Sequence, residues 1–269
     1  MPRLSVDLDL VYTKYSNDRQ SDFDSINNDL SSIKDRLERF NLHVIEQISG
    51  KEGFHKLLVS RDGILVKVEV NYVMRGTLSP VEPRKVSKSV EDQFLVDVTA
   101  PLLAESEIYA GKILAALDRQ HPRDLFDVLK LYESSGLTDE MIEDFVCYLC
   151  CHDRTFGDVL ASHDKDISDI YYNEFEGMTL QEVSVDDLIA TRSRLRKDIL
   201  SRLTDNHKTF LLGFALADPD WSLMKYAHLK DIPAVKWKLL NLQKLLVKNN
   251  DKFHNQHNLL RQLFQLTKF

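Results

Sequence analysis

After Pro101 the hydrophobic pattern of this chain takes the period of a helix and keeps it to the end, and that change limits the folds open to the chain. Before Pro101, apolar side chains mostly recur at every second residue, as in a half-buried strand. After Pro101 they recur at spacings of three and four residues, which indicates amphipathic helices. We therefore predict an α+β region followed by an all-helical region.

The first region is expected to contain five strands, at 4–12, 42–48, 54–60, 64–72 and 93–99, and one helix at 22–40. Two turns are predicted to close hairpins, one at Arg61-Asp62-Gly63 and one at 49–53. Helices are expected in the second region at 102–119, 123–134, 139–151, 185–203, 206–217, 235–249 and 254–266. We place a domain boundary near residue 135, which gives domains 1–135 and 136–269.

Charge is distributed unevenly along the chain. From residue 192 to the end there are fifteen Lys and Arg against six Asp and no Glu, a net +9, so residues 1–191 carry −16 of the total −7. Such an asymmetry can mark a surface for polyanions. Aromatic Trp221, Tyr226 and Trp237 interleave with these cations, which is consistent with RNA binding through phosphates. The acidic front half of the same chain is an alternative anionic partner.

The basic residues recur in two runs. They are Arg192, Arg194, Arg196, Lys197 and Arg202, followed by Lys225, Lys230, Lys236, Lys238, Lys244 and Lys248.

The cysteines and the apolar runs indicate a cytoplasmic protein with no membrane partner. All three cysteines, Cys147, Cys150 and Cys151, fall in one short stretch, which is no disulfide framework and lacks the spaced ligands of a zinc site. We expect them to be small apolar residues on a buried helix. The chain has no apolar run of about 18 residues and no signal peptide at its start.

Carboxylates on two predicted strands are the first candidate for chemistry. Asp7 and Asp9 are two residues apart, so both side chains point the same way from their strand. Glu69 lies on the polar face of another strand, and the three carboxylates would converge if the two strands are neighbours. Hard Mg²⁺ prefers such oxygen ligands, and the set would suit phosphoryl or nucleotidyl transfer. Ordinary solvent-facing acids are the simpler interpretation.

Two predicted helices supply the second candidate. Lys112 lies in the middle of an apolar helix, where it could hold a triphosphate or simply extend to the surface. Arg123 and Asp124 occupy the first turn of the next helix, where the helix dipole alone favours an Asp. Asp127 is three residues from Asp124, so both lie on about one helix face.

Taken together, these segments resemble the AbiEii/AbiGii toxin family of nucleotidyltransferases. Arg3 to Leu10, R-L-S-V-D-L-D-L, is similar to the family's Asp-x-Asp strand, and Val66 to Asn71 is similar to its third-carboxylate strand. Glu107 to Asp127 resembles the family's Lys…Arg-Asp helix pair, and His228 to Leu242 resembles its C-terminal L-P-A-x-x-W-K-L segment. The resemblance covers nearly the whole chain.

The resemblance implies a polymerase-β-like nucleotidyltransferase fold, with a mixed sheet and flanking helices, followed by an all-helical C-terminal domain. It implies a toxin that transfers a nucleotide from a nucleoside triphosphate, with Mg²⁺ or Mn²⁺, to RNA such as tRNA. It also implies a cognate antitoxin, often a winged-helix repressor.

Site residues follow from the same resemblance. Asp7, Asp9 and Glu69 would be catalytic metal ligands. Lys112 and Asp124 would be further catalytic residues, while Ser5, Lys112 and Arg123 would contact the nucleotide.

One departure from the family pattern bears on activity. Members carry a Gly-Gly or Gly-Ser element before the Asp-x-Asp strand, and it opens a helix whose N-terminus holds the triphosphate. Only six residues precede Asp7 here, and none is Gly. The start would then lie further upstream, or the chain is clipped, or it is a catalytically inactive member that binds a partner or nucleotide. A metal-dependent phosphohydrolase fits the carboxylates but not the Lys112 helix.

Overall fold

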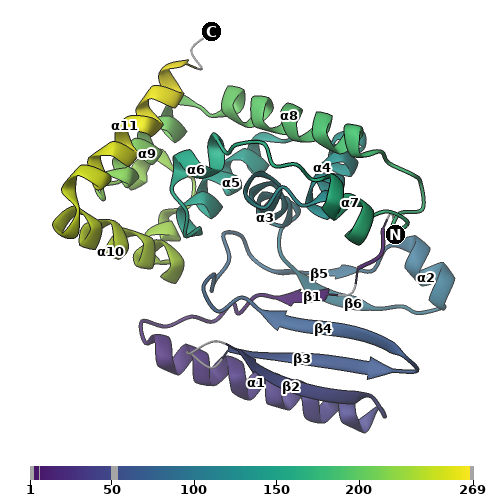
Figure 1. Cartoon of the computed structure of the whole chain (residues 1–269). Coiled ribbons are helices and arrows are strands. Elements are labelled where there is room, and N and C mark those ends of the chain that lie inside the picture. The colour runs from purple at the N-terminus through teal and green to yellow at the C-terminus, as the bar shows by residue number, and fades with distance from the viewer. Residues whose placement is uncertain (1–2, 6, 50–53, 267–269) are drawn as a thin grey trace. The chain divides into compact units, whose positions relative to one another are not determined.

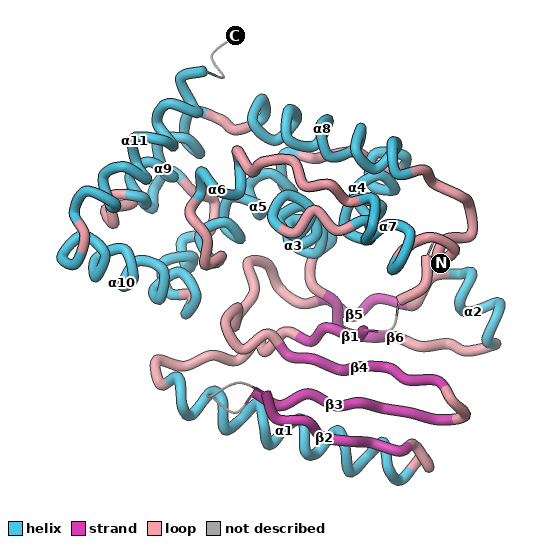
Figure 2. The backbone as a smooth tube through the Cα atoms, viewed as in Figure 1, coloured by secondary structure: helices cyan, strands magenta, loops and turns pink. Residues whose placement is uncertain are grey.

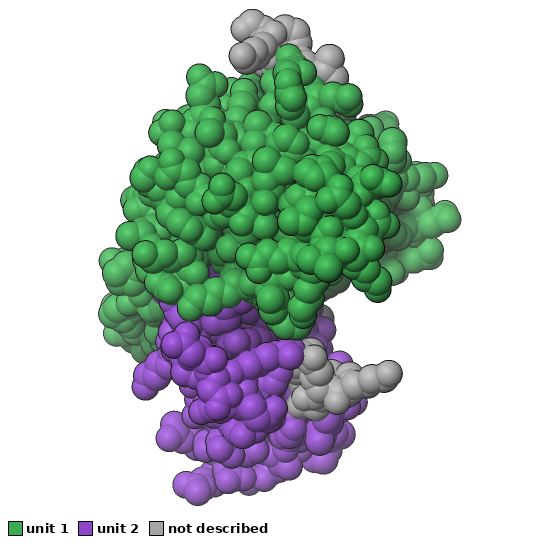
Figure 3. Space-filling model, turned by 90° about the vertical axis from the view of Figure 1, so that its left-hand side faces the viewer, with its two compact units in different colours: residues 1–3, 78–231, 235–269 green, residues 4–77, 232–234 purple. Residues whose placement is uncertain are grey.

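The computed structural model describes residues 3–5, 7–49 and 54–266. The chain forms two compact units (Figure 3). One contains residues 4–77 and 232–234, and is called here the sheet unit. The other contains residues 1–3, 78–231 and 235–269, and is called the helical unit.

The sheet unit is built on four strands in the order β1-β4-β3-β2. Their bounds are β1 Asp7–Leu10, β2 His43–Ser49, β3 Phe54–Arg61 and β4 Ile64–Val70. β1 is parallel to β4, whereas β4, β3 and β2 form an antiparallel meander. The strand predicted at 4–12 is thus shorter than expected, and the mixed sheet was predicted correctly.

One helix covers one face of this sheet (Figures 1 and 2). It is α1, Arg19–Arg39, and it packs against β2 and β3. The Asp18 side chain accepts hydrogen bonds from the first free backbone amides, those of Gln20 and Ser21, and so caps the helix. The predicted start at residue 22 was three residues late because the polar first turn carries no apolar period.

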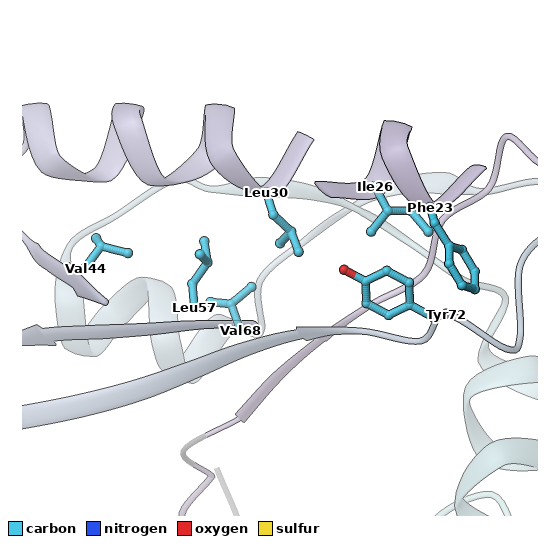
Figure 4. Packing of buried hydrophobic residues seen from close by; sticks show 7 residues of the cluster. All are labelled: Phe23, Ile26, Leu30, Val44, Leu57, Val68 and Tyr72. Carbon is cyan, nitrogen blue, oxygen red and sulfur yellow. The ribbon is translucent and has the colours of Figure 1, made fainter. Parts of the chain in front are cut away.

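The core of the sheet unit lies between α1 and the strands (Figure 4). It consists of Phe23, Ile26, Leu30, Val44, Leu57, Val68 and Tyr72. Leu30 and Leu57 are fully buried, and each contributes about 1.5–3 kcal/mol relative to an exposed side chain. The odd-numbered residues of β1 and β4 point to the opposite face of the sheet, since side chains alternate along a strand.

The predicted hairpin at Arg61 to Gly63 is confirmed. Asp62 and Gly63 both have positive φ, 52° and 80°, as a two-residue turn between twisted strands requires. Asp and Gly adopt these angles more readily than other residues. The turn predicted at 49–53 lies mostly outside the described residues.

The strand predicted at 93–99 is wrong. Residues up to Phe94 belong to helix α2, Lys88–Phe94, which ends at Leu95 in a left-handed conformation with φ 52°. A short strand, β6 Thr99–Leu102, follows and pairs antiparallel with β5 Glu82–Lys85. The alternation of apolar and polar residues at 93–99 therefore covers the end of α2 and the segment that leads into β6.

The described chain continues after β6 with the α-helices α3 to α11. The bounds are α3 Glu105–Asp118, α4 Pro122–Glu133, α5 Asp139–Cys151, α6 Phe156–Leu160, α7 Ser168–Glu174, α8 Val185–Arg202, α9 Asp205–Ala215, α10 Pro233–Lys248 and α11 Asn250–Leu266. All seven helices predicted after Pro101 are confirmed, with ends that differ by a few residues. The short α6 and α7 were missed because they are under two helical turns long.

The core of the helical unit is formed largely by α3, α4, α5, α8 and α9, with α3 packed on α5 and α4 on α8. Ile113, Leu125, Phe145, Leu195 and Phe210 are fully buried there. Helix starts are capped in turn by His121, Thr138, Ser184 and Thr204. The units divide the chain by packing, so a functional boundary at residue 135 stays a prediction.

Candidate active site

The carboxylate-bearing strands are neighbours, which was the condition for their carboxylates to share one face. In the parallel register of β1 and β4, Asp9 lies opposite Glu69 and Asp7 lies opposite Lys67. Side chains at paired positions of neighbouring strands share a face, so all four groups lie on the sheet face opposite α1. The apolar Leu10, Val68 and Val70 take the α1 face. The alternation of polar and apolar residues along β1 and β4 thus places the four charged side chains on one face.

A lysine ammonium lies between two of these carboxylates. Lys67 Nζ is 3.4 Å from Asp7 Oδ1 and 3.2 Å from Glu69 Oε2. Burial lowers the pKa of Lys67, but the hydrogen bond to Glu69 and the two negative charges outweigh it and raise the pKa above 10.5. Lys56 adds a second cation, 3.9 Å from the other Glu69 oxygen. Part of the negative charge on this face is therefore already neutralised.

The sheet face that carries Asp7, Asp9 and Glu69 offers oxygen donors for a Mg²⁺ or Mn²⁺ ion. Three carboxylates supply the hard oxygen donors that these ions prefer, and the Lys67 ammonium shows that a cation is accommodated between Asp7 and Glu69. Across the described ranges, however, no three His, Cys, Asp or Glu side chains are grouped closely enough to hold a metal. The donors fit a divalent ion in kind, and Lys67 would have to move for it to bind.

A second charged cluster lies in the helical unit, on α3 and α4. Lys112 Nζ donates a 2.5 Å hydrogen bond to Asp127 Oδ2. Arg3 donates to both oxygens of the same carboxylate, at 2.7 and 2.8 Å. Burial would raise the pKa of Asp127, but the Arg3 hydrogen bond and the Lys112 charge outweigh it and lower the pKa below 3.8. Asp127 is therefore ionised and joins two cations.

The remaining predicted residues have different surroundings. Asp124 is held by Arg119, whose Nη2 and Nε lie 2.8 and 3.1 Å from its two oxygens. Arg123 is half-buried, and its guanidinium has no ion-pair partner within the described part of the chain. Ser5 is exposed beside β1. Ser5, Asp7, Asp9 and Glu69 belong to the sheet unit, and Lys112, Arg123 and Asp124 belong to the helical unit.

Sequence reasoning missed three charged residues of these clusters. Asp127 was noted only as the helical neighbour of Asp124, and Arg3 and Lys67 were not considered as site residues. A signal for Lys67 was available, because it is two residues from Glu69 on one strand and so shares its face. Arg3 is 124 residues from Asp127 in the chain, and nothing in the local sequence indicates that pairing.

Part of the basic C-terminal segment pairs with carboxylates of residues 1–191, which was the alternative interpretation. Arg192 is buried and donates to Gln120 Oε1 at 3.0 Å and to the Lys165 carbonyl at 2.7 Å. Lys225 lies 2.6 Å from Glu140, and Arg196 lies 2.7 Å from Asp164. The expectation that Arg192 presents its charge to RNA is therefore wrong.

Lys238 is the second basic residue that cannot face RNA. It is buried, and its Nζ donates to the Leu149 carbonyl at 2.8 Å and to the Arg154 carbonyl at 2.9 Å. Burial lowers the pKa of Lys238 to about 8. Its ammonium therefore satisfies backbone carbonyls near the end of α5.

The cysteines behave as predicted for a buried helix. Cys147 and Cys150 are fully buried on α5, and all three thiols are free. Burial raises the pKa of Cys150 to about 12 and also raises that of Cys147 and Cys151. These thiols are packing groups.

Comparison with known proteins decides the family. The profile of the nucleotidyl transferase AbiEii toxin family, of type IV toxin–antitoxin systems, matches residues 1–240. The chain belongs to the AbiEii family. It is accordingly a nucleotidyltransferase toxin of a type IV toxin–antitoxin system, and AbiEii membership implies a nucleotide substrate and a cognate antitoxin.

A solved structure shares the fold of this AbiEii chain. It is MenT4, a nucleotidyltransferase toxin from Mycobacterium tuberculosis H37Rv, with a TM-score of 0.52 and 17% sequence identity over 89% of this chain and 78% of MenT4. The likeness confirms the predicted α+β fold class. No curated protein matches the sequence significantly. No helix in the described ranges is long and apolar enough to span a membrane.

Proposed function

We propose that this AbiEii chain transfers a nucleotide from a nucleoside triphosphate to RNA, specifically to tRNA, in the cytoplasm. The observation that carries the proposal is the parallel register of β1 and β4, which sets Asp9 opposite Glu69 with Asp7 on the same face. In the transfer, an RNA hydroxyl oxygen bonds to the α-phosphorus, its proton is released, and pyrophosphate leaves.

The carboxylate face has the first role in this proposal. Asp7, Asp9 and Glu69 would hold Mg²⁺ or Mn²⁺, which when bound neutralises triphosphate charge and lowers the pKa of the attacking hydroxyl. Lys67 would leave its position between Asp7 and Glu69 as the ion enters. Its ammonium would then pair with a phosphate oxygen of the nucleotide.

The residues of α3 and α4 have the second role. Lys112 and Arg123 would contact the phosphates, Lys112 exchanging the Asp127 carboxylate for a phosphate oxygen of similar charge. Asp124 is proposed as a further catalytic residue, and its pairing with Arg119 orients the carboxylate. Ser5 would donate its hydroxyl to the nucleotide. The antitoxin is proposed to be a winged-helix repressor.

A second candidate is a nucleotide- or partner-binding member without catalysis. It is favoured by the Lys67 ammonium between Asp7 and Glu69, which occupies the place of a metal ion. Incubation with labelled nucleoside triphosphates, Mg²⁺ and total tRNA separates the two. Transfer that Asp7→Ala abolishes supports the enzyme, whereas nucleotide binding without transfer supports the second candidate. Equal transfer by wild type and Asp7→Ala would contradict the proposed site.

A further inference from the structure

Helix α10 presents two faces of different chemistry. Its inner face carries the buried Ala234, Val235 and Lys238. The outer face carries a row of exposed residues at spacings of one, three and four, called here the α10 stripe: Trp237, Leu240, Asn241, Lys244, Val247 and Lys248. At these spacings the side chains lie on one side of a helix.

The apolar members of the α10 stripe are unusually accessible. Trp237 is 48% exposed, Leu240 is 42% exposed and Val247 is 89% exposed. A solvated helix face would normally carry polar groups at these positions. Because Trp237 is about half exposed, its ring can offer an apolar plane to a partner. A partner that binds through charge alone would make no use of that plane.

The charged members of the stripe are all positive. Helix α10 contains four Lys and neither Asp nor Glu, and residues 233–266 contain six Lys and Arg against one Asp. Lys244 Nζ lies 5.5 Å from the centre of the Trp237 ring, so a cation and an aromatic plane are presented together. This combination complements a ligand that carries both flat rings and negative charge.

The rest of the basic segment does not offer the same chemistry. Arg192 and Lys238 are buried, Lys225 pairs with Glu140, and Arg202 donates to the Leu137 carbonyl. Trp221 contacts the rings of Phe210 and Phe214. Arg194 lies 3.7 Å from the centre of the Tyr132 ring and Lys225 lies 5.1 Å from that of Tyr226, but each of these cations pairs with a carboxylate, of Asp198 and Glu140 respectively. Within the described part of the basic segment, α10 is where a lysine lies beside an exposed aromatic ring.

We propose that the α10 stripe binds unpaired nucleotides of RNA, with a base stacked on Trp237 and phosphates held by Lys244 and Lys248. Stacking on an aromatic side chain requires an unpaired base, whereas a duplex hides its base faces. The inference rests on the proposed function, because it assigns a docking surface to the RNA substrate. An acidic protein is the other partner that the charge would allow, but it supplies no ring to stack on Trp237.

The experiment uses tryptophan fluorescence as a local probe. The chain has two tryptophans, so Trp221→Phe leaves Trp237 as the sole reporter. Titration with a 12-nucleotide oligouridylate is expected to quench that fluorescence. Because Trp221 packs on Phe210 and Phe214, its replacement can affect folding. Fluorescence anisotropy of labelled oligouridylate with Trp237→Ala, in a chain that keeps Trp221, provides the independent measurement.

Charge reversal tests the lysines against a matched control. Lys244→Glu with Lys248→Glu is expected to weaken oligouridylate binding at least about 10-fold and to reduce its salt dependence, since each phosphate contact on a single strand contributes about 0.7 to the slope. Lys208→Glu on α9 makes the charge change of one of these two substitutions outside the stripe and is expected to have little effect. Trp237→Ala is expected to weaken binding about 5-fold or more.

Three outcomes would overturn the inference. They are no quenching of Trp237 fluorescence, an equal loss of affinity in the stripe variants and in Lys208→Glu, and binding of a 12-base-pair RNA duplex as tight as that of the single strand.

Nucleotide transfer to total tRNA distinguishes the failure of this inference from the failure of the proposed function. If the stripe variants transfer with unchanged KM for tRNA, the stripe assignment fails and the proposed function stands. If wild type binds oligouridylate through the stripe but transfers nothing, the proposed function fails.

Discussion

Lys112 on α3 is hydrogen-bonded at 2.5 Å to Asp127 on α4, not to Asp124, which pairs with Arg119 instead. Asp127 also accepts two hydrogen bonds from Arg3. One half-buried carboxylate thus orders a lysine proposed to contact phosphate and an arginine from the start of the chain. The neighbouring Asp124 orders only an exposed arginine.

This difference predicts unequal effects of two matched substitutions. Asp127→Asn leaves Lys112 and Arg3 without their anion and is expected to lower the free energy of unfolding by about 1–3 kcal/mol. Asp124→Asn breaks a pair with an exposed arginine and is expected to cost less than about 1 kcal/mol. Urea denaturation of both variants measures this. A cost for Asp124→Asn equal to or above that for Asp127→Asn would contradict the described pairing.

The position of Lys67 leads to a prediction about the affinity of the carboxylate face for Mn²⁺. Because its ammonium lies between Asp7 and Glu69, Lys67→Met is expected to strengthen Mn²⁺ binding several-fold, as a competing positive charge is removed. Asp9→Asn is expected to weaken it. Electron paramagnetic resonance of free Mn²⁺ gives both affinities. Unchanged binding in Lys67→Met would show that the ion binds elsewhere.

Lys238 predicts a pH dependence of stability. Its pKa is lowered to about 8 in the folded chain against 10.5 for an ordinary lysine. Between these values the unfolded chain holds more protons, so the unfolding free energy rises with pH, and below pH 8 the folded state bears the full cost of the buried charge. Relative to Lys238→Met, the wild-type free energy should rise by about 3 kcal/mol from pH 7 to pH 10.5.

Two measurements test whether the unfolding free energy rises with pH as Lys238 loses its proton. Urea denaturation at several pH values gives the free-energy difference, and a difference that is flat or falls with pH would contradict it. NMR of ¹³C-labelled lysine should show one side chain that titrates near pH 8 and is missing from Lys238→Met.

The cysteines predict protection from thiol reagents. Burial raises the pKa of the Cys150 thiol to about 12 and that of Cys147 as well, so little reactive thiolate forms at pH 8. In the folded chain Cys147 and Cys150 should react with Ellman's reagent only on the time scale of unfolding, and in denaturant all three thiols should react at once. Rapid labelling of two or more thiols in the folded chain would contradict this.

Sequence periodicity predicted most of the fold. The long helices and the β2–β3–β4 meander depend on local apolar spacing, which the sequence shows directly. The stretch at 93–99 was misread because its alternation continues across the end of α2, where Leu95 takes a left-handed conformation. Such a change of backbone is decided by the β5–β6 pairing around it and not by the residues of the stretch.

The candidate site was predictable only in part, because its ion pairs depend on contacts between distant segments of the chain. Asp7 and Asp9 share a face by spacing alone, and Glu69 and Lys112 were candidates from their own strand and helix. The resemblance to AbiEii proteins assigned catalytic roles to these residues and to Asp124. The partners of these residues depend on tertiary contacts. The Lys112–Asp127 pair joins two helices, and burial of Arg192 and Lys238 depends on packing within the helical unit. Positive charge in the sequence therefore overstated the surface available to RNA.

The central claim is that the carboxylate face of β1 and β4 serves nucleotide transfer to tRNA. The most direct measurement is the transfer of label from α-³²P nucleoside triphosphates to total tRNA with Mg²⁺, comparing wild type with Asp9→Asn, which keeps the size of the side chain and removes its charge. The account predicts labelled tRNA with wild type and a loss of at least about 100-fold with Asp9→Asn, since a metal ligand is removed. No labelled tRNA with wild type, or equal labelling by the two proteins, would contradict it.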